Sequence, residues 1–414
     1  MDRDPRRILT THVGSLIRPP ALVEFLRAKL FDEPYDEAAY GACLRMSVAR
    51  VVRQQAEIGL DIVNDGEFGK SSWFRYIGER LSGFTFRVTP GQKAKGSPSS
   101  GNDFERFRDF YTEYNSTREP TGPAGNWVVA GPVAYKGQAA VQRDIDNFKH
   151  ALGQVRAEAG FLPVVAPASA TANLKDEYYG DDEKLIFALA DALRDEYRAI
   201  ADAGLIVQVD DAWLTAMHDH MVPPWTMAQY RDWAELRVAA LNRALDGIPE
   251  ERTRYHICWG SWNGPHVFDV PIRDILPLLM KIKVGAYSFE AANPRHGHEW
   301  QAWKTVKVPK GKALMPGVVT HSTNIVEHPE LVAERLMHYA SIVGKENVMA
   351  GTDCGFAQSP FARRVHPTIQ WAKLEALAEG AKIASKRLWG KAKPKSKAPK
   401  AKAKPKAKPA RRAA

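Results

Sequence analysis

Four residues of this 414-residue chain have the types and spacing of a metal site: His256, Cys258, Glu290 and Cys354. Side chains at positions i and i+2 of a β-strand point to the same face, so His256 and Cys258 can bind one ion together. Imidazole, thiolate and carboxylate groups are ligands of zinc, and four of them complete its tetrahedron. Because a zinc finger takes its ligands in close pairs, this wider spacing predicts a Zn²⁺ centre assembled from separate stretches of the chain.

The chain alternates between short apolar runs and longer amphipathic runs, a pattern that predicts βαβ units and a parallel sheet. We expect strands at 7–13, 61–65, 127–131, 162–166, 205–210, 253–258, 284–290, 313–318 and 346–351. We expect helices at 37–59, 141–158, 183–203, 226–245, 270–281, 329–343 and 364–386. So many units favour a closed (β/α)8 TIM-type barrel over an open sheet. One strand is surplus to eight, and we expect it to be 162–166, because its flanking sequence has loop character.

A barrel of this kind places its active site where the carboxyl ends of the strands meet. The predicted strands end in polar or metal-binding residues, at 12–15, 65–67, 210–211, 256–258, 290, 320–321 and 353–354. By itself, a His-x-Cys is more typical of a buried core cysteine than of a ligand pair. The placement of all four candidate ligands at strand ends favours the zinc centre, whereas Cys43 lies in a predicted helix and is expected to pack in the core.

Composition predicts one large globular domain followed by a tail. Residues 1–390 are expected to form a single catalytic barrel, in which 87–125, rich in Gly, Pro, Ser and charge, is an insertion or long loop. Residues 391–414 contain nine Lys, two Arg and no acidic residue, a composition that buries too little apolar area to fold, so we expect disorder. Without this tail the formal charge of +10 falls to about −1, so only the tail is expected to attract nucleic acid, and weakly.

The sequence also predicts the compartment. No run of about 18 apolar residues is present, so no membrane span is expected. The first residues contain no apolar segment of the kind found in secretory signals. Three cysteines are too few for a disulfide framework and indicate a reducing environment. We therefore expect a cytoplasmic protein.

Eight segments, taken in order, resemble the catalytic half of the cobalamin-independent methionine synthases and their relatives, which include epoxyalkane:coenzyme M transferase. They are THVGS (11–15), NDGEFGKSSWFRYIGERLSGF (64–84), AGPV (130–133), VQVDD (207–211), YHICW (255–259), YSFEAAN (287–293), MPGVVTHS (315–322) and GTDCG (351–355). The resemblance covers residues 8 to about 358. It implies a (β/α)8 barrel that holds Zn²⁺ through His256, Cys258, Glu290 and Cys354.

The resemblance further implies a zinc-dependent enzyme that transfers a methyl or other alkyl group to a thiol. A thiol has a pKa of about 8.5 and attacks only as the thiolate, and binding to zinc removes its proton. In methionine synthases the residues that match Glu67 and Asp210 bind the amino group of homocysteine, and the residue that matches Ser15 contacts its other end. Because carboxylates suit an ammonium group and repel a sulfonate, homocysteine is the favoured acceptor. His321 is implied as the catalytic proton donor for the leaving group.

The methyl donor is left open by the sequence. Methyltetrahydrofolate, a methyl-corrinoid protein, another methylated metabolite and an epoxide are the alternatives. Tyr135 and Gln138 lie near the position of the family's pterin-stacking tryptophan, which is replaced in this chain. Trp73, Trp259 or Trp262 would then be the candidates for another stacking surface.

Three other functions are open from the sequence alone. An epoxyalkane:coenzyme M transferase-like enzyme would need a cationic pocket for the sulfonate, for which Lys70 and Arg75 are the nearby candidates. A zinc hydrolase or lyase would use metal-bound water, although hydrolytic zinc sites prefer histidine and carboxylate ligands. A non-enzymatic zinc- or nucleic-acid-binding protein would depend on the Lys-rich tail. His266, His296 and His298 match no pattern and are assigned no role.

Overall fold

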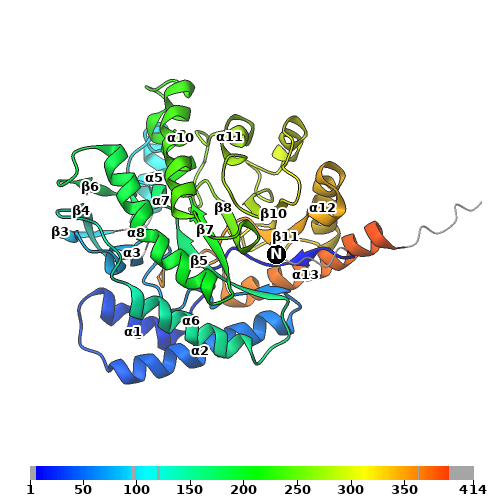
Figure 1. Ribbon diagram of the computed structural model, residues 1–414, viewed down its shortest axis with the longest axis horizontal. Helices are drawn as coiled ribbons and strands as arrows, with labels where there is room; N and C mark the ends of the chain where they lie inside the picture. Colours follow the sequence, from blue (N-terminus) through cyan, green and yellow to red (C-terminus); the bar gives the residue numbers. More distant parts are fainter. Residues whose placement is uncertain (1–5, 95–97, 119–121, 362, 391–414) are drawn as a thin grey trace, which may run out of the picture.

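Eight parallel strands form one sheet that curves into a barrel (Figure 1). The computed structural model describes residues 6–94, 98–118, 122–361 and 363–390. The strands follow the order β1-β11-β10-β9-β8-β7-β5-β2, and every neighbouring pair is parallel. They are β1 (Leu9–Thr10), β2 (Ile62–Val63), β5 (Ala159–Val165), β7 (Ile206–Asp211), β8 (Thr253–Ile257), β9 (Ala286–Glu290), β10 (Ala313–Val319) and β11 (Met349–Thr352).

The first and last strands of that order are also neighbours, which completes the ring. The backbone N–H of Asp61 donates to the carbonyl of Thr10 at 3.1 Å, and the Thr11 hydroxyl donates to the carbonyl of Ile62 at 3.0 Å. The Asp61 carboxylate also accepts from the backbone N–H of Thr10 at 2.8 Å. The (β/α)8 barrel predicted from the alternation of elements is therefore confirmed.

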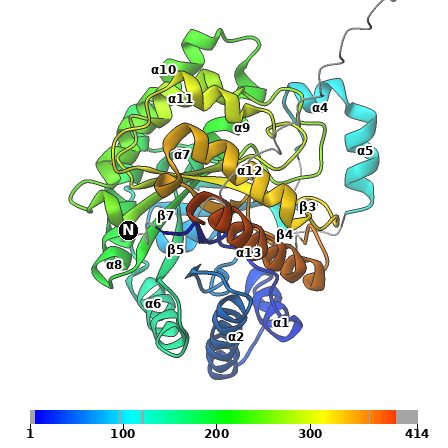
Figure 2. The same ribbon diagram turned by 90° about the vertical axis from the view of Figure 1, so that its right-hand side faces the viewer.

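Helices pack around the outside of the barrel (Figures 1 and 2). Those of eight or more residues are α1 (Pro20–Leu30), α2 (Glu37–Glu57), α6 (Gln138–Leu152), α8 (Asp182–Asp202), α9 (Trp213–Met221), α10 (Met227–Ala244), α11 (Ile272–Leu279), α12 (Pro329–Val343) and α13 (Pro367–Trp389). Shorter ones are α3 (Tyr76–Arg80), α7 (Pro167–Ala170) and the 3₁₀ turns at 250–252, 299–305 and 345–347.

Helix α8 illustrates why these segments are helical. The Asp181 side chain caps the helix by accepting from the backbone N–H of Lys184 at 2.9 Å. Leu185, Leu189 and Leu193 recur at helical spacing and are buried. One face of the helix therefore packs toward the sheet while the other remains polar.

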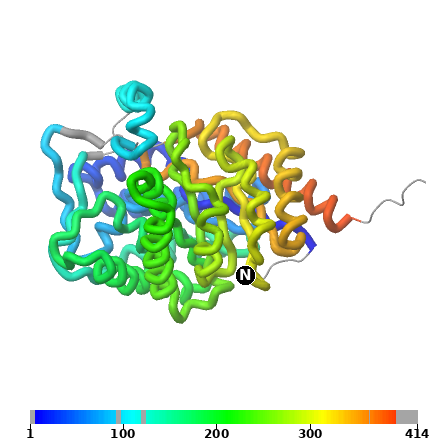
Figure 3. The backbone as a smooth tube through the Cα atoms, turned by 90° about the horizontal axis from the view of Figure 1, so that it is seen from above, coloured from blue at the N-terminus to red at the C-terminus, as the bar shows by residue number. Residues whose placement is uncertain are grey.

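A second, smaller sheet lies beside the barrel. Strand β3 (Phe84–Ala94) pairs antiparallel with β4 (Gly122–Val129), and β4 pairs in parallel with β6 (Leu174–Asp176). The helices α4 (Asn102–Arg106) and α5 (Arg108–Ser116) lie between β3 and β4 in the chain and stand beyond the outline of the barrel (Figure 3). The predicted insertion at 87–125 thus contains strands and helices in place of an irregular loop.

The choice of 162–166 as the surplus strand is wrong. Residues 159–165 form β5, which lies in the barrel between β2 and β7, whereas 127–131 overlaps β4 of the small sheet. Strand β5 is almost entirely buried because both faces of a parallel barrel strand are covered. The loop-like sequence that follows it forms the short helix α7 and strand β6. The loop character of the flanking sequence was therefore misleading about the strand itself.

The interior of the barrel changes from apolar to polar along the strands. Near the amino ends, apolar side chains form one cluster, here called the barrel floor: Leu9, Ile62, Phe161, Ile206, Ala286, Ala313, Met315 and Met349. Gln208, two residues beyond Ile206 on β7, and its partner Arg254 on β8 come next, and both are fully buried. Beyond these, alternation brings Asp210, His256 and Glu290 to the carboxyl ends, here called the barrel mouth. The same strands therefore supply both the packing and the chemical groups.

Two predictions concern the surroundings of the barrel. Among the described helices, none is long and apolar enough to cross a membrane. The predicted disorder and nucleic-acid attraction of residues 391–414 lie outside the residues that the structure describes.

Candidate metal centre and substrate pocket

His256, Cys258 and Cys354 come together at the barrel mouth. Their potential ligand atoms all lie within 4.8 Å of one another, and all three residues are buried. His256 lies in β8 and Cys258 directly follows it, while Cys354 follows β11. Three of the four predicted zinc ligands thus form one cluster, although they come from strands that are distant in the sequence.

The ring of His256 is held in an orientation that leaves one nitrogen available. Its Nδ1 lies 3.0 Å from the hydroxyl of Ser288, the residue opposite it on β9. Its Nε2 is buried and has no hydrogen-bond partner in the described part of the chain. A buried polar atom without a partner is costly, so this nitrogen fits a metal ligand whose other ring nitrogen is oriented by a neighbour.

The two thiols of the cluster differ in their acidity. The Cys258 side chain hydrogen-bonds Cys354 and, together with His256, holds the pKa of Cys354 well below its usual range in spite of burial. The same contact, with burial, raises the pKa of Cys258 well above its usual value. Cys354 is therefore the more acidic of the two thiols, and a metal cation would favour the thiolate form of both.

Glu290, the fourth predicted ligand, lies beside the cluster and outside it. Its carboxylate accepts from the backbone N–H of Trp259 at 2.9 Å and from the side-chain amide of Asn293 at 2.6 Å. Burial, together with the charges of Asp353 and Cys354, raises its pKa well above the usual value. Each carboxylate oxygen keeps a second lone pair, so these hydrogen bonds do not prevent it from binding a metal.

Asp353 connects the strand ends that carry Glu290 and Cys354. One oxygen of its carboxylate accepts from the backbone N–H groups of Ala291 and Ala292, both at 2.8 Å. Gly317 on β10 permits this contact, because a Cβ at that position would lie 2.5 Å from the backbone of Asp353. A glycine is required here by close backbone approach, and the approach fixes the spacing of the two ligand-bearing loops.

The predicted substrate-binding residues line the same mouth. Burial is the main cause that raises the pKa of both Glu67 and Asp210, and Cys354 adds to it in each case, so all three groups act on one another. Asp210 accepts from the Gln208 amide at 2.7 Å. Ser15 lies against the residue after Cys354: a Cβ on Gly355 would come within 2.0 Å of its hydroxyl oxygen.

Glu67 adopts a backbone conformation that is unusual for a residue other than glycine. Its φ angle is 58°, and its backbone N–H donates to the Asp65 carboxylate at 2.9 Å. The guanidinium of Arg18 donates to the Glu67 carbonyl at 2.7 Å. Such strained conformations persist only where surrounding contacts enforce them, and they concentrate at functional sites.

The two cations proposed for a sulfonate have other partners. The Lys70 ammonium donates to the Pro163 carbonyl, lies 4.4 Å from the centre of the Tyr76 ring and is 4.0 Å from the Glu67 carboxylate. Arg75 lies over the ring of Phe86 at 5.0 Å. A cationic pocket in this part of the mouth is therefore not formed by these residues.

His321 lies in the loop after β10 and is buried with both ring nitrogens lacking a hydrogen-bond partner among the described residues. Burial lowers its pKa to about 4, while Cys354 acts in the opposite direction. Glu327 closes this loop: its carboxylate accepts from the Thr320 backbone N–H at 2.9 Å and pairs with the buried ammonium of Lys373 on α13 at 2.9 Å. An internal ion pair thus supports the loop that carries His321.

The sequence did not reveal a chain of contacts beneath the mouth. The guanidinium of Arg254 donates to the Gln208 side-chain oxygen at 2.6 Å and lies 3.6 Å from the centre of the Phe161 ring. Gln208 in turn holds Asp210. Burial lowers the pKa of Arg254 to about 9, and the charge of Asp210 counteracts this. The sequence could have indicated Arg254, because a residue two positions before His256 lies on the same face of the strand.

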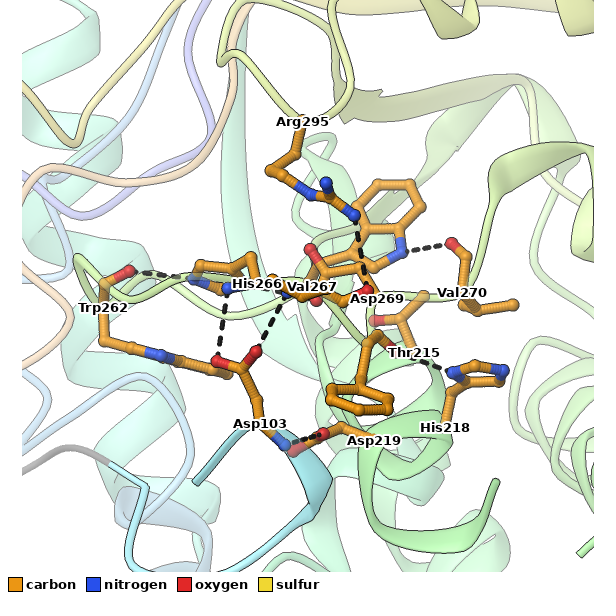
Figure 4. A network of polar contacts seen from close by, with 12 residues as sticks. Asp103, Thr215, His218, Asp219, Trp262, His266, Val267, Asp269, Val270 and Arg295 are labelled. Carbon is orange, nitrogen blue, oxygen red and sulfur yellow. Dashed lines mark hydrogen bonds and ion pairs between the residues drawn. The ribbon is translucent and has the colours of Figure 1, made fainter. Parts of the chain in front are cut away.

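The loop after Cys258 is tied to the insertion (Figure 4). Asp103 of α4 accepts from the backbone N–H groups of His266 at 3.2 Å and Val267 at 3.0 Å. The His266 ring lies 3.2 Å from the Asp269 carboxylate and stacks on Trp262. This histidine, to which the sequence assigned no role, therefore takes part in the contacts that join the loop after Cys258 to α4.

His296, also without a predicted role, lies in a buried charged cluster next to that loop. Its ring nitrogens lie 3.1 Å from Asp269 and 2.8 Å from Glu299. Although burial opposes it, these carboxylates raise the pKa of His296 to about 10. The ring also stacks on Trp259 at 4.1 Å, which buries that tryptophan and removes it from the candidate stacking surfaces.

Comparison with known proteins identifies the family of this chain. The sequence matches the family described as "Cobalamin-independent synthase, Catalytic domain" over residues 8–158 and 174–372. This chain belongs to that family. It is 23% identical to a methionine synthase of Thermococcus kodakarensis over 391 residues, which covers 92% of this chain and 94% of the relative. It is 24% identical over 409 residues to the 2-hydroxypropyl-CoM lyase of Xanthobacter autotrophicus, with 92% and 96% covered.

A solved structure supports the same fold. The B12-independent methionine synthase from Shewanella sp. W3-18-1, in complex with selenomethionine, superposes with a TM-score of 0.69 at 22% sequence identity. The match covers 92% of this chain and 99% of that one. The resemblance stated from the sequence motifs is therefore confirmed, and the chain is an enzyme of the methionine-synthase type.

Proposed function

We propose that this enzyme transfers a methyl group to the sulfur of homocysteine and forms methionine, with Zn²⁺ as its resident metal. The observation that carries the proposal is the buried cluster of His256, Cys258 and Cys354 with the carboxylates of Glu67 and Asp210 beside it. The methionine synthases among the relatives agree with this acceptor.

The residues of the cluster fit zinc on chemical grounds. Two thiols and an imidazole with a buried, unpartnered Nε2 are soft and borderline donors of the kind that zinc prefers, and Glu290 is the candidate for a fourth ligand. When bound, zinc lowers the pKa of a thiol so that it reacts as a thiolate at neutral pH. A hydrolase is less favoured, because sulfur-rich ligation is unusual for hydrolytic zinc.

The carboxylates of Glu67 and Asp210 bind the ammonium group of the acceptor in this proposal. Both are buried, and burial raises the pKa of each, so a cationic group between them stabilises their ionised forms. Gln208 orients Asp210, and Ser15 offers a hydroxyl next to Gly355 for the other end of the amino acid. An ammonium group held in this way directs the sulfur of homocysteine toward Cys258 and Cys354.

His321 carries the proton in the proposed reaction. The S–H bond of the acceptor and the bond between the methyl group and its donor break, and the S–CH₃ bond forms. The thiol proton ends on the leaving nitrogen when the donor is methyltetrahydrofolate, and it passes to solvent when a methyl-corrinoid leaves as Co(I). The two ring nitrogens of His321 have no described protein partner, so one can accept a proton while the other donates one. Burial keeps the ring neutral before the reaction, with a pKa of about 4.

The donor remains a matter for experiment, and methyltetrahydrofolate and a methyl-corrinoid protein are the two proposed sources. A second candidate function is the alkylation of a different thiol, as by the epoxyalkane:coenzyme M transferases. The relative named 2-hydroxypropyl-CoM lyase favours this alternative, because it aligns over as much of the chain as the methionine synthases.

A panel of thiols and donors tests the proposal. Purified, zinc-loaded enzyme is incubated with homocysteine or 2-mercaptoethanesulfonate, each in combination with methyltetrahydrofolate, methylcobalamin or epoxypropane, and the thioether products are measured by mass spectrometry. We expect methionine from homocysteine. Products from 2-mercaptoethanesulfonate alone would contradict the proposed acceptor, and thioether formation that survives complete zinc removal would contradict the metal.

A further inference from the structure

Arg364 lies between β11 and α13 and is connected to Cys354 through one side chain. It is half-buried and follows the last barrel strand in the sequence. Its Nε donates to the side-chain oxygen of Gln358 at 3.3 Å, and the amide nitrogen of Gln358 lies 4.0 Å from the sulfur of Cys354. One side chain therefore separates this guanidinium from a candidate metal ligand.

Arg364 lacks, among the residues that the structure describes, the carboxylate partner that the buried residues Arg80 and Arg237 have. Arg80 is paired with Asp144 at 2.5 Å and with Glu196 at 2.8 Å, and Arg237 is paired with Asp182 at 2.5 Å. Within the described ranges, no carboxylate lies within ion-pair distance of Arg364.

Its hydrogen bonds are also incomplete. Arg364 contacts only Gln358 and the hydroxyl of Tyr114 in the described part of the chain, although a guanidinium has five N–H donors. Arg18 and Arg254, which also lack a carboxylate partner, place their donors on backbone carbonyls and side-chain oxygens instead. Among the described residues, several N–H donors of Arg364 thus have no acceptor.

Neighbouring charges show that an anion would stabilise the charged form of Arg364. Burial and then the nearby charge of Arg118 lower the pKa of Arg364 to about 10, whereas Tyr114 and Cys354 raise it. Arg364 also contributes to the lowered pKa of His321. The charges of Arg364, Cys354 and His321 therefore act on one another, and a further negative charge beside the guanidinium would stabilise it.

We propose that Arg364 binds an anionic group, a carboxylate or a sulfonate, on the substrate whose reacting atom lies between Cys354 and His321. A planar guanidinium presents paired N–H donors that match two oxygens of such a group. The proposal rests on the proposed alkyl transfer and adds the recognition of an acid, so the mouth offers carboxylates for a cation at Glu67 and Asp210 and a guanidinium for an anion at Arg364.

The anionic group has two possible sources, the acceptor thiol or the alkyl donor. Homocysteine carries a carboxylate and 2-mercaptoethanesulfonate a sulfonate, while a folate donor carries the carboxylates of its glutamate. Each has a neutral or shortened counterpart: 3-mercaptopropylamine lacks the carboxylate of homocysteine, 2-mercaptoethanol lacks the sulfonate, and a methylated pterin without the glutamate lacks the carboxylates of the folate.

The experiment measures binding with these matched pairs, so that it does not depend on turnover. Dissociation constants for zinc-loaded wild-type enzyme, Arg364→Gln, Arg364→Lys and the control Arg363→Gln are determined by calorimetry. Arg363 is the exposed neighbour in the sequence, and it controls for general charge effects. Zinc content and melting temperature verify that each variant is folded.

We expect Arg364→Gln to weaken binding of one acidic ligand at least about tenfold while its counterpart changes less than about twofold. Arg364→Lys should restore part of the loss, and Arg363→Gln should bind as the wild type does. The pair that shows the selective loss identifies the acceptor or the donor as the source. Equal losses for acidic and neutral ligands, or no loss in any pair, would overturn the proposal.

The outcomes also separate this proposal from the proposed function. If wild-type enzyme makes methionine and Arg364→Gln binds every ligand unchanged, the alkyl transfer stands and the anion site is wrong. If Arg364→Gln loses only 2-mercaptoethanesulfonate and homocysteine does not bind wild-type enzyme, the anion site stands and homocysteine is wrong.

Discussion

The floor and the mouth of the barrel are built by the same strands and obey different rules. At the floor, Met349 on β11 packs in a cluster of apolar side chains. At the mouth, the atoms His256 Nε2, both nitrogens of His321 and one oxygen of Asp353 are buried without partners in the described residues. The comparison teaches that the fold is stabilised at one end while unsatisfied polar atoms are kept for chemistry at the other.

The strongest test of this difference between floor and mouth is to remove a thiol at the mouth. Cys258→Ser or Cys354→Ser should lower zinc affinity by at least roughly 100-fold, because even residues behind metal ligands are worth 10- to 100-fold. The melting temperature of the metal-free protein should change little. Zinc is quantified by mass spectrometry after dialysis against a chelator.

Cys43 on α2 provides the matched control for these variants, since it is a half-buried cysteine outside the cluster. Cys43→Ser should retain wild-type zinc content. Loss of zinc from Cys43→Ser, or its retention in both cluster variants, would contradict the assignment of the centre.

Replacement of His321, the proposed proton carrier at the mouth, should have the next largest effect, which is on kcat. His321→Ala should reduce kcat by about 10²- to 10⁴-fold, the range of general acid–base catalysis, with zinc content unchanged. Steady-state kinetics with the acceptor and donor identified by the thiol panel measure this. A variant with normal kcat would show that the ring has a structural function only.

The loop that carries His321 should depend on its buried ion pair. Lys373→Met leaves the Glu327 carboxylate buried without its cation, so we expect a loss of about 3–5 kcal/mol in the free energy of unfolding and a lower kcat at similar KM. Urea denaturation and kinetics measure the two effects. Arg387→Met removes an exposed ion pair between α13 and Glu330 of α12 and should cost only about 0–1 kcal/mol. Equal losses in both variants would refute the special position of Lys373.

A substitution at the floor should show the opposite result from one at the mouth. Met349→Ala removes side-chain volume from a fully buried position on β11, so the free energy of unfolding should fall by about 2–5 kcal/mol. The folded protein should bind zinc as tightly as the wild type does, although Cys354 follows the same strand. A parallel drop in zinc affinity would mean that floor and mouth are coupled.

The stability of the protein should also depend on pH through His12, a buried residue that follows β1. Burial lowers the pKa of His12 from 6.5 to about 4, and its Nε2 lies 2.8 Å from the Gln55 side-chain oxygen. Between these pKa values the unfolded chain binds a proton that the folded chain does not, so stability from His12 is complete above pH 6.5 and declines as the pH falls toward 4.

At 1.36 kcal/mol per pKa unit, the decline amounts to about 3 kcal/mol. It is measured as the difference in free energy of unfolding between wild type and His12→Gln over this pH range. A pH-independent difference would show that His12 has the same pKa in both states.

The sequence predicted the fold wherever its signals are local. Alternating apolar and amphipathic segments indicated the barrel, and strand-end motifs indicated His256, Cys258 and Cys354. The choice between 127–131 and 162–166 failed because a strand's partner is a long-range property: both segments are apolar, and only the register with β2 and β7 assigns 159–165 to the barrel.

The residues missed at the site share a physical reason. Arg364, Lys373 and Asp103 act through side chains that reach across from distant elements, so neither spacing nor alternation marks them. His266 and His296 looked unremarkable because their partners Asp269 and Glu299 become significant only when buried together. Sequence motifs therefore identify the functional residues at the strand ends, but they do not identify the distant residues that hold them in place.

The position of Arg254 has a consequence for how substrates enter the barrel and how products leave it. Its guanidinium rests on Phe161, and the apolar floor lies beneath, so the barrel is a cup with a closed base. Both substrates and both products must then share one opening. In the proposed alkyl transfer, an acceptor whose sulfur lies nearest the floor would therefore bind before the donor and leave after it.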